Sequence, residues 1–213
     1  MKITIVYDNE VKKEGLRAGW GFSALVEDVE VSPVLFDTGA DGSALLHNMK
    51  ELNIDPHDID TIVISHGHGD HTGGLSEIPK VNKIAELYLP SSFRGAFPGR
   101  KVTMVKRPVQ IRENVFSTGE LEGVEQSLAL KTDEGLFVLT GCAHPGMESI
   151  LAAAAEFGEL YGIAGGFHGF RDFKVFNGLS LICPCHCTEY KQEIRDLFKD
   201  KTLECGAGLV IRL

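Results

Sequence analysis

The sequence has little positive charge for its length. Its 213 residues include 21 Lys and Arg against 30 Asp and Glu, which gives a formal net charge of −9. A nucleic-acid partner requires clustered basic side chains, so this balance argues against nucleic-acid binding. The only basic stretch, residues 93–108, fits an exposed loop followed by an edge strand, with a phosphate contact near the mouth of a site as the alternative.

Long apolar runs are also missing. The N-terminal sequence MKITIVYDNE holds an apolar run of no more than five residues, too short for a signal peptide or a membrane span. We therefore expect a cytoplasmic protein without a membrane partner. An odd number of cysteines without a secretion signal argues against a disulfide framework. The five cysteines are Cys142, Cys183, Cys185, Cys187 and Cys205.

Linkers, low-complexity tracts and short repeats are absent too, which predicts one domain over residues 1–213. Apolar periodicity predicts two runs of strands, each accompanied by helices, and this pattern indicates stacked sheets covered outside by helices. The expected strands are 2–7, 22–27, 61–64, 86–89, 102–106, 127–131, 135–140, 159–164, 179–183 and 208–212, and the expected helices are 42–53, 147–157 and 188–199. The segment 31–39 also runs apolar, as a strand would, and then breaks at Asp-Thr-Gly.

A cluster of metal-binding side chains follows one of the predicted strands, in the stretch SHGHGDHTGGL at residues 65–75. Positions i and i+2 of an extended chain face the same side, so His66 and His68 can converge on one ion. Asp70 and His71 point elsewhere and can begin the site of a second ion. Zinc accepts this mixture of nitrogen and oxygen donors, and manganese and iron are the alternatives.

These motifs resemble the metallo-β-lactamase superfamily. The pattern His-x-His-x-Asp-His after a strand, with FDTG upstream, is typical of it. The motifs WGFSALVE, STGE, TGCAHPG, GGFHG and CPCHCTEY occur in the order expected for one branch, whose members resemble a dihydropterin-type phosphate synthase. The resemblance implies an α/β fold, a four-layer αββα sandwich with a one- or two-metal site at the sheet edges.

By this resemblance, later residues complete the metal site. His144 in TGCAHPG supplies the third histidine of the first metal, and His186 in CPCHCTEY supplies the last histidine of the second. Cys142 stands where the superfamily commonly has a bridging aspartate, so either its thiolate or solvent alone bridges the ions. His168 in GGFHG is a further candidate, as a ligand or as a donor to substrate, with a loop histidine bonded to backbone as the alternative.

Two carboxylates are candidates for supporting roles beside the ligands. Asp37 in FDTG can accept the free N–H of a metal-bound histidine and so fix the tautomer of that ring. A tight turn without a functional role is the alternative for this residue. Glu120 in STGE stands where the superfamily commonly has a histidine, and we expect it close to the metal ligands.

The sequence CPCHC needs a separate interpretation. Cys183, Cys185 and Cys187 alternate, so in an extended chain they would point one way, opposite to His186. Their spacing is tighter than that of zinc knuckles or the usual iron–sulfur motifs. Buried small side chains flanking a ligand are the favoured interpretation, and a three-cysteine cluster is the alternative.

Two metal ions would lower the pKa of a shared water toward neutrality, and Asp70 can orient or deprotonate that water. We therefore predict hydrolysis of a small, phosphorylated substrate, with Asp70 and His168 as catalytic residues. The resemblance also implies condensation of a pterin diphosphate with an aromatic amine. A non-hydrolytic metal or iron–sulfur redox protein that uses the CPCHC cysteines is the rival class.

Aromatic residues in the predicted loops are candidates for contact with the substrate. Trp20, Phe22 and Phe93, in or beside these loops, can stack on a planar ring, with plain packing as the alternative. The sequence does not identify the substrate or the oligomeric state.

Overall fold

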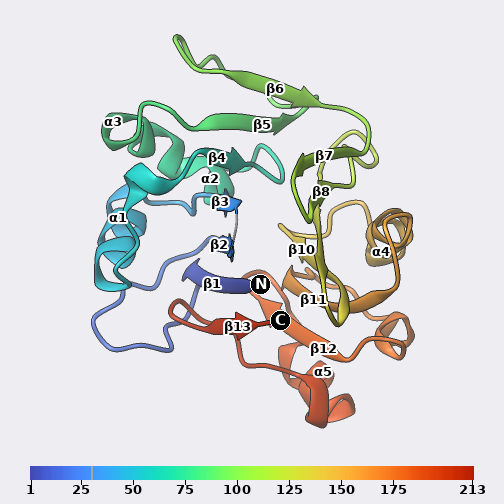
Figure 1. Cartoon of the computed structure of the whole chain (residues 1–213). Coiled ribbons are helices and arrows are strands. Elements are labelled where there is room, and N and C mark those ends of the chain that lie inside the picture. Colours follow the sequence, from blue (N-terminus) through green and yellow to red (C-terminus); the bar gives the residue numbers. More distant parts are fainter. Residues whose placement is uncertain (30) are drawn as a thin grey trace.

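The computed structural model describes residues 1–29 and 31–213. Two β-sheets lie face to face, and helices cover their outer faces (Figure 1). The first sheet has seven strands in the order β13-β1-β2-β3-β4-β5-β6, and the second has six in the order β12-β11-β10-β9-β8-β7.

The strands of the first sheet are β1 (Lys2–Tyr7), β2 (Ser23–Asp28), β3 (Val31–Phe36), β4 (Thr61–Val63), β5 (Glu86–Pro90), β6 (Val102–Val105) and β13 (Val210–Arg212). Those of the second sheet are β7 (Val109–Arg112), β8 (Val115–Ser117), β9 (Leu128–Thr132), β10 (Gly135–Thr140), β11 (Leu160–Gly166) and β12 (Leu181–Cys185).

Helix α1 (Gly42–Glu51) lies outside the first sheet, and α4 (Met147–Ala155) and α5 (Lys191–Leu197) lie outside the second (Figure 1). The shorter helices are α2 (Gly69–Thr72) and α3 (Ile78–Val81), with 3-10 turns η1 (Pro56–Asp58), η2 (Gly73–Ser76), η3 (Phe173–Phe176) and η4 (Lys199–Lys201).

The strands bury both of their faces because alternate side chains enter different cores. In β2, Val26 enters the core between the two sheets, whereas Leu25 packs in the layer that contains α1. In β10, Leu139 enters the same central core, and Val138 packs in the layer that contains α4. The result is the four-layer αββα sandwich that the resemblance implies.

Each sheet contains a run of parallel strands that end at the same edge. Strands β3, β4, β5 and β6 are parallel in the first sheet, and β10, β11 and β12 are parallel in the second. Ligands of α/β proteins bind outside the carboxyl ends of such strands. The segments that follow β3, β4, β10, β11 and β12 contain all the predicted metal ligands.

Most predicted elements are present, with shifted ends. The helix expected at 188–199 spans only Lys191–Leu197, since the backbone N–H groups of Thr188 and Glu189 donate to the carbonyl oxygens of Cys185 and His168 instead. Strands β7 and β8 were not predicted. They have four and three residues and form a hairpin at the edge of the second sheet, too short for a clear apolar alternation.

The expectation about disulfides is wrong in one respect. Cys185 at the end of β12 is bonded to Cys205, 20 residues later, with their Cα atoms 5.2 Å apart. The bond joins β12 to the segment that precedes β13. Cys142, Cys183 and Cys187 are free and buried.

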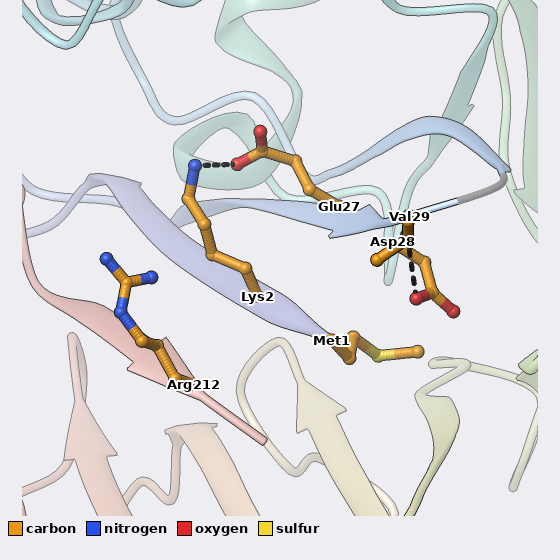
Figure 2. Close-up of a pocket in the computed structure, with 6 residues that line it drawn as sticks. All are labelled: Met1, Lys2, Glu27, Asp28, Val29 and Arg212. Atoms are coloured by element: carbon orange, nitrogen blue, oxygen red, sulfur yellow. Dashed lines mark hydrogen bonds and ion pairs between the residues drawn. The ribbon is translucent and has the colours of Figure 1, made fainter.

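A pocket at the far end of β1 and β2 contains none of the predicted site residues. Figure 2 shows its lining, in which Lys2 pairs with Glu27 at 2.6 Å and Met1 and Arg212 lie beside them. Lys2 begins β1, whereas the metal-binding segments lie beyond the other end of that strand. In the described part of the chain, no helix is both long enough and apolar enough to cross a membrane.

A buried asparagine joins α1 to the first sheet. The side chain of Asn48 donates to the carbonyl oxygens of Val6 and Arg17, both at 2.9 Å, and accepts from the Arg17 N–H at 2.8 Å. Asn48 has no exposed surface. Its loss would leave buried backbone groups without partners.

We expect Asn48→Ala to lower the free energy of unfolding by about 1–3 kcal/mol, because an unsatisfied buried polar group loses its solvation without replacement. Urea denaturation followed by circular dichroism measures the change. The exposed helix residue Lys50 is the control, since Lys50→Ala should alter stability by less than about 0.5 kcal/mol. Equal midpoints for the two variants would contradict the role of Asn48.

Candidate metal centre

The ends of strands from both sheets place a group of histidines together. Strand β4 leads into His66 and His68, β10 into Cys142 and His144, and β12 into His186. The rings of His66 and His144 lie 4.7 Å apart between centroids, although they come from different sheets. The fold therefore joins residues that are far apart in the chain, 78 positions for this pair and 116 for Asp70 and His186.

The first group of donors contains three histidines. Nε2 of His66 lies 3.0 Å from Nδ1 of His68 and 3.2 Å from Nε2 of His144. His66 is buried, His144 is half-buried and His68 is exposed, so the group opens to solvent on one side. This is the set that the sequence predicted for the first metal.

The second group adds oxygen and sulfur donors. Nε2 of His71 lies 3.1 Å from Sγ of Cys142 and 3.9 Å from Oδ2 of Asp70. The same Asp70 oxygen lies 3.2 Å from Nε2 of His186. The His66 and His71 rings are 4.2 Å apart between centroids, so the two groups adjoin.

Buried acceptors fix the tautomers of two of these rings. Asp37 accepts from the backbone N–H and the hydroxyl of Ser65 and lies 2.7 Å from Nδ1 of His71, which must therefore donate. Because the Ser65 hydroxyl donates to Asp37, it can only accept from Nδ1 of His66, at 2.9 Å. In the neutral form of each ring, the nitrogen without a proton is therefore Nε2, which faces the cluster.

Asn9 fixes the third ring in the same way. Its amide nitrogen donates to the carbonyl oxygen of His186 at 2.9 Å, and its Oδ1 lies 3.0 Å from Nδ1 of that ring. Nδ1 must therefore donate, and Nε2 of His186 is free as a ligand. The buried Asp8 accepts the backbone N–H of His186 at 2.8 Å and holds the same residue.

The electrostatics keep two of these rings neutral. Burial, followed by the charges of His71 and His144, lowers the pKa of His66 well below its usual value. Burial and the charge of His71 lower the pKa of His186 to about 4. Neutral imidazole is the form that binds a metal ion.

His71 differs from these two rings. Burial opposes its charge, but the Asp37 carboxylate outweighs that effect and raises the pKa of His71.

Glu125 organises the loop that carries Cys142 and His144. Its Oε1 accepts from the Thr140 hydroxyl and from the backbone N–H groups of residues 141, 142 and 143, at 2.9–3.2 Å. Its Oε2 accepts from the N–H of His144 at 3.0 Å. Glu125, Asn9 and Ser65 were not predicted from the sequence, in which the signal for Asn9 and Ser65 is their place after a predicted strand.

Several residues of the centre have a left-handed backbone. The φ angles are 57° for Asp37, 57° for Ala143, and 45° for both His168 and His186. Each lies within three residues of the end of a strand. Such conformations cost non-glycine residues roughly 1–3 kcal/mol, and they are typical of functional sites.

Two of the predicted substrate-contacting residues lie at the rim. Trp20 is 61% exposed, donates from Nε1 to Oδ2 of Asp70 at 2.9 Å, and has its ring 4.8 Å from that of His186. The half-buried Phe93 approaches Gly67 of the histidine loop. His168 is exposed, with its ring 4.7 Å from that of His144.

Two other predicted residues lie elsewhere. Phe22 was expected to contact substrate, but it has no exposed surface and packs against Phe36 in the core between the sheets, so this expectation is wrong. Glu120 accepts hydrogen bonds from the Ser91 hydroxyl and from the Ser92 N–H. Its carboxylate thus holds the loop after β5, while Glu125 holds the ligand loop.

The CPCHC cysteines do not point one way, as an extended chain would require. Cys183 and Cys185 lie in the core between the sheets, with their sulfurs 3.8 Å apart. The left-handed conformation of His186 turns the chain, and the sulfur of Cys187 contacts Cys142 at 3.4 Å. The interpretation of these cysteines as buried small side chains that flank a ligand describes their burial. It does not describe the different direction of the Cys187 side chain.

The donor atoms fit a divalent metal ion. Neighbouring ligand atoms of a tetrahedral zinc site are separated by about 3.3–3.8 Å, given bond lengths near 2.0–2.3 Å. The distances between donors described above run from 3.0 to 3.9 Å. Free nitrogens that face one another repel unless a cation lies between them. The residues present therefore suit a centre with nitrogen, oxygen and sulfur ligands.

Comparisons with known proteins agree with this geometry. The family model of the metallo-beta-lactamase superfamily matches residues 21–149, which is more than half of the chain. The crystal structure of Tm1679, described as a metal-dependent hydrolase of the beta-lactamase superfamily, has a TM-score of 0.81 and 30% identity over 100% of this chain and 99% of its own.

Two further proteins are similar. A curated relative from Methanocaldococcus jannaschii, 7,8-dihydropterin-6-methyl-4-(beta-D-ribofuranosyl)-aminobenzene-5'-phosphate synthase, is 28% identical over 84% of this chain and 84% of its own. The metallo-beta-lactamase fold protein YhfI from Bacillus subtilis has a TM-score of 0.69 at 14% identity, over 99% and 98% of the two chains, and shows the fold alone. The family match, together with the fold and the histidine cluster, shows that the chain belongs to the metallo-β-lactamase superfamily.

Proposed function

We propose that the protein is a metal-dependent hydrolase that acts on a small, phosphorylated molecule. The observation that carries the proposal is the convergence of the Nε2 atoms of His66, His71 and His186 with the donors Asp70 and Cys142. Their partners Ser65, Asp37 and Asn9 hold Nδ1 of each ring, so that the neutral rings present Nε2 to a cation or to a substrate proton.

The proposed centre holds two divalent ions, with zinc as the first choice and manganese or iron as alternatives. His66, His68 and His144 would hold one ion, and Asp70, His71, His186 and Cys142 would hold the other. When bound, such ions lower the pKa of water and polarise phosphoryl or carbonyl oxygens.

The chain's own residues supply the remaining chemistry. One oxygen of Asp70 accepts from Trp20, and a carboxylate in this position can also orient a water molecule or take its proton. His168 projects from the rim beside His144, where its ring can donate to a substrate oxygen. Asp37 and Asn9 keep the ligating rings in one orientation.

The surroundings of the centre support a small substrate. The exposed indole of Trp20 and the half-buried ring of Phe93 offer flat surfaces on different sides of the histidine loop. Arg94, exposed and next to Phe93, can contact a phosphate. The net charge of −9 disfavours nucleic acid as a partner, and a cytoplasmic location without a membrane partner remains our prediction.

Condensation of a pterin diphosphate is the second candidate, and the similarity to the M. jannaschii synthase favours it. In that reaction the nitrogen of an aromatic amine forms a bond to the methylene carbon of the pterin. The carbon–oxygen bond to diphosphate breaks, and the amine proton passes to a base. The same donors would hold the metal ions that bind the diphosphate, and Trp20 would stack on the pterin ring.

A redox or iron–sulfur role for the CPCHC cysteines has less support. Cys185 is bonded to Cys205, and Cys187 contacts Cys142 instead of Cys183. One disulfide sulfur and two thiols that lie in different places are a poor set of cluster ligands. Purified protein should accordingly lack visible absorption and inorganic sulfide, and a coloured protein that contains both iron and sulfide would revive this alternative.

We expect His66→Ala to abolish activity and to lower the bound metal below the wild-type level of about two zinc or manganese ions per chain. Elemental analysis and phosphoester hydrolysis, measured before and after chelation and metal return, test this. His57→Ala is the control, because His57 is exposed and pairs only with Asp55. A wild-type protein that binds no metal, or a fully active His66→Ala variant, would refute the proposal.

The two candidate reactions are separable with the same protein preparation. Hydrolysis predicts turnover of a phosphoester with water alone. Condensation predicts release of diphosphate from a dihydropterin diphosphate only when an aromatic amine is present. Amine-dependent release without any phosphoester turnover would replace the first candidate with the second.

We expect Glu125→Gln to weaken metal binding about 10–100-fold, because the amide would present N–H groups to backbone N–H groups that now donate to a carboxylate. Metal affinity from competition with a chelator is the readout, with kcat and KM measured at saturating metal. Glu120→Gln is the matched control, since that carboxylate binds Ser91 and Ser92. Equal losses in the two variants would show a general effect on folding instead of positioning of the ligand loop.

A further inference from the structure

Two cysteine sulfurs meet at the inner side of the metal centre. Sγ of Cys142 lies 3.4 Å from Sγ of Cys187, although one residue follows β10 and the other follows β12. Cys142 is 2% exposed and Cys187 is 7% exposed. Neither thiol belongs to the disulfide between Cys185 and Cys205.

Both sulfurs lie beside the second group of donors. Sγ of Cys142 lies 3.1 Å from Nε2 of His71, the ring whose Nδ1 donates to Asp37. The donor atoms of Cys142, Cys187 and His186 all lie within 4.8 Å of one another. Cys187 is therefore close enough to this group to share an ion with Cys142 and His186.

The backbone is shaped to bring Cys187 there. The φ angle of 45° at His186 turns the chain after β12, so that Cys187 does not follow Cys183 and Cys185 into the core. Gly166 at the end of β11 lies directly against the sulfur, since a Cβ atom at that position would be 2.5 Å from Sγ of Cys187. A side chain larger than hydrogen at 166 would displace the thiol from the centre.

We propose that Cys187 is a metal ligand and that it forms a thiolate pair with Cys142 at the position shared with His71 and His186. This inference rests on the proposed function, because it requires that the centre binds a metal ion. As the ion binds, each thiol loses its proton to solvent and no oxidant is needed. Two thiolates select a borderline metal such as zinc over manganese or magnesium, which prefer oxygen ligands.

Cobalt reports thiolate ligands directly, because thiolate-to-cobalt charge transfer absorbs in the near ultraviolet. Chelator-treated, thiol-reduced wild-type protein titrated with Co²⁺ should show this band. Cys187→Ala should lose about half of its intensity and the double variant with Cys142→Ala should lose all of it. The matched control is Cys183→Ala, which removes a buried free thiol whose sulfur contacts Cys185 instead.

Four results would overturn the inference. A Cys187→Ala variant with the full band would show that Cys187 is not a ligand, as would a wild-type band that survives in the double variant. Bound cobalt that shows ligand-field bands but no charge-transfer band would show that neither thiolate is a ligand. The metal centre of the proposed function would then still stand. Protein that binds no cobalt at all would refute the inference and the proposed function together.

A measurement on wild-type protein covers the case in which a variant does not fold. X-ray absorption at the zinc edge of the zinc-loaded protein should require sulfur scatterers at about 2.3 Å beside nitrogen and oxygen. A fit with nitrogen and oxygen alone would refute the thiolate pair. Mass spectrometry of the protein as isolated adds a further test, because a Cys142–Cys187 disulfide that persists in metal-loaded protein is incompatible with two thiolate ligands.

Discussion

The structure depends on one buried carboxylate, that of Asp37. It has no exposed surface, and its two oxygens accept from the backbone and the hydroxyl of Ser65 and from the ring of His71. Burial raises the pKa of Asp37, so its charged form exists only because these donors surround it. The same hydrogen bonds decide which nitrogen of His66 and of His71 is free. Asp37 thus determines the chemistry of a site that it does not enter.

The two sheets contribute unequal parts to the centre. The first sheet supplies a compact run, His66 to His71, on a loop and a single short helix. The second sheet supplies single residues from the ends of β10 and β12, each held by a carboxylate or an amide from a distant segment. The precision of the site therefore depends on how the sheets pack, and the central core of apolar side chains between them sets that distance.

The sequence predicted the αββα fold, most strands and the histidine cluster, because each leaves a local pattern: a β-branched run, a change of period, or ligands spaced by two. It did not predict the partners Glu125 and Asn9, whose roles arise from contacts across 19 and 177 residues. The prediction for Phe22 was wrong for a related reason. An aromatic residue beside a glycine has the same local sequence pattern in a loop and at a buried strand end. The direction of Cys187 followed from a single φ angle that no residue type indicates.

The left-handed residues at the strand ends have a thermodynamic consequence. Asp37, Ala143, His168 and His186 hold conformations that an L-residue leaves readily, and each is kept by the contacts around it. A ligand that binds only the folded chain stabilises that chain. At concentrations well above the dissociation constant, the gain grows with the logarithm of the ratio of ligand concentration to dissociation constant. The free energy of unfolding of this protein therefore rises with the occupancy of its metal centre. Selection for higher metal affinity would also have selected for tolerance of a strained backbone.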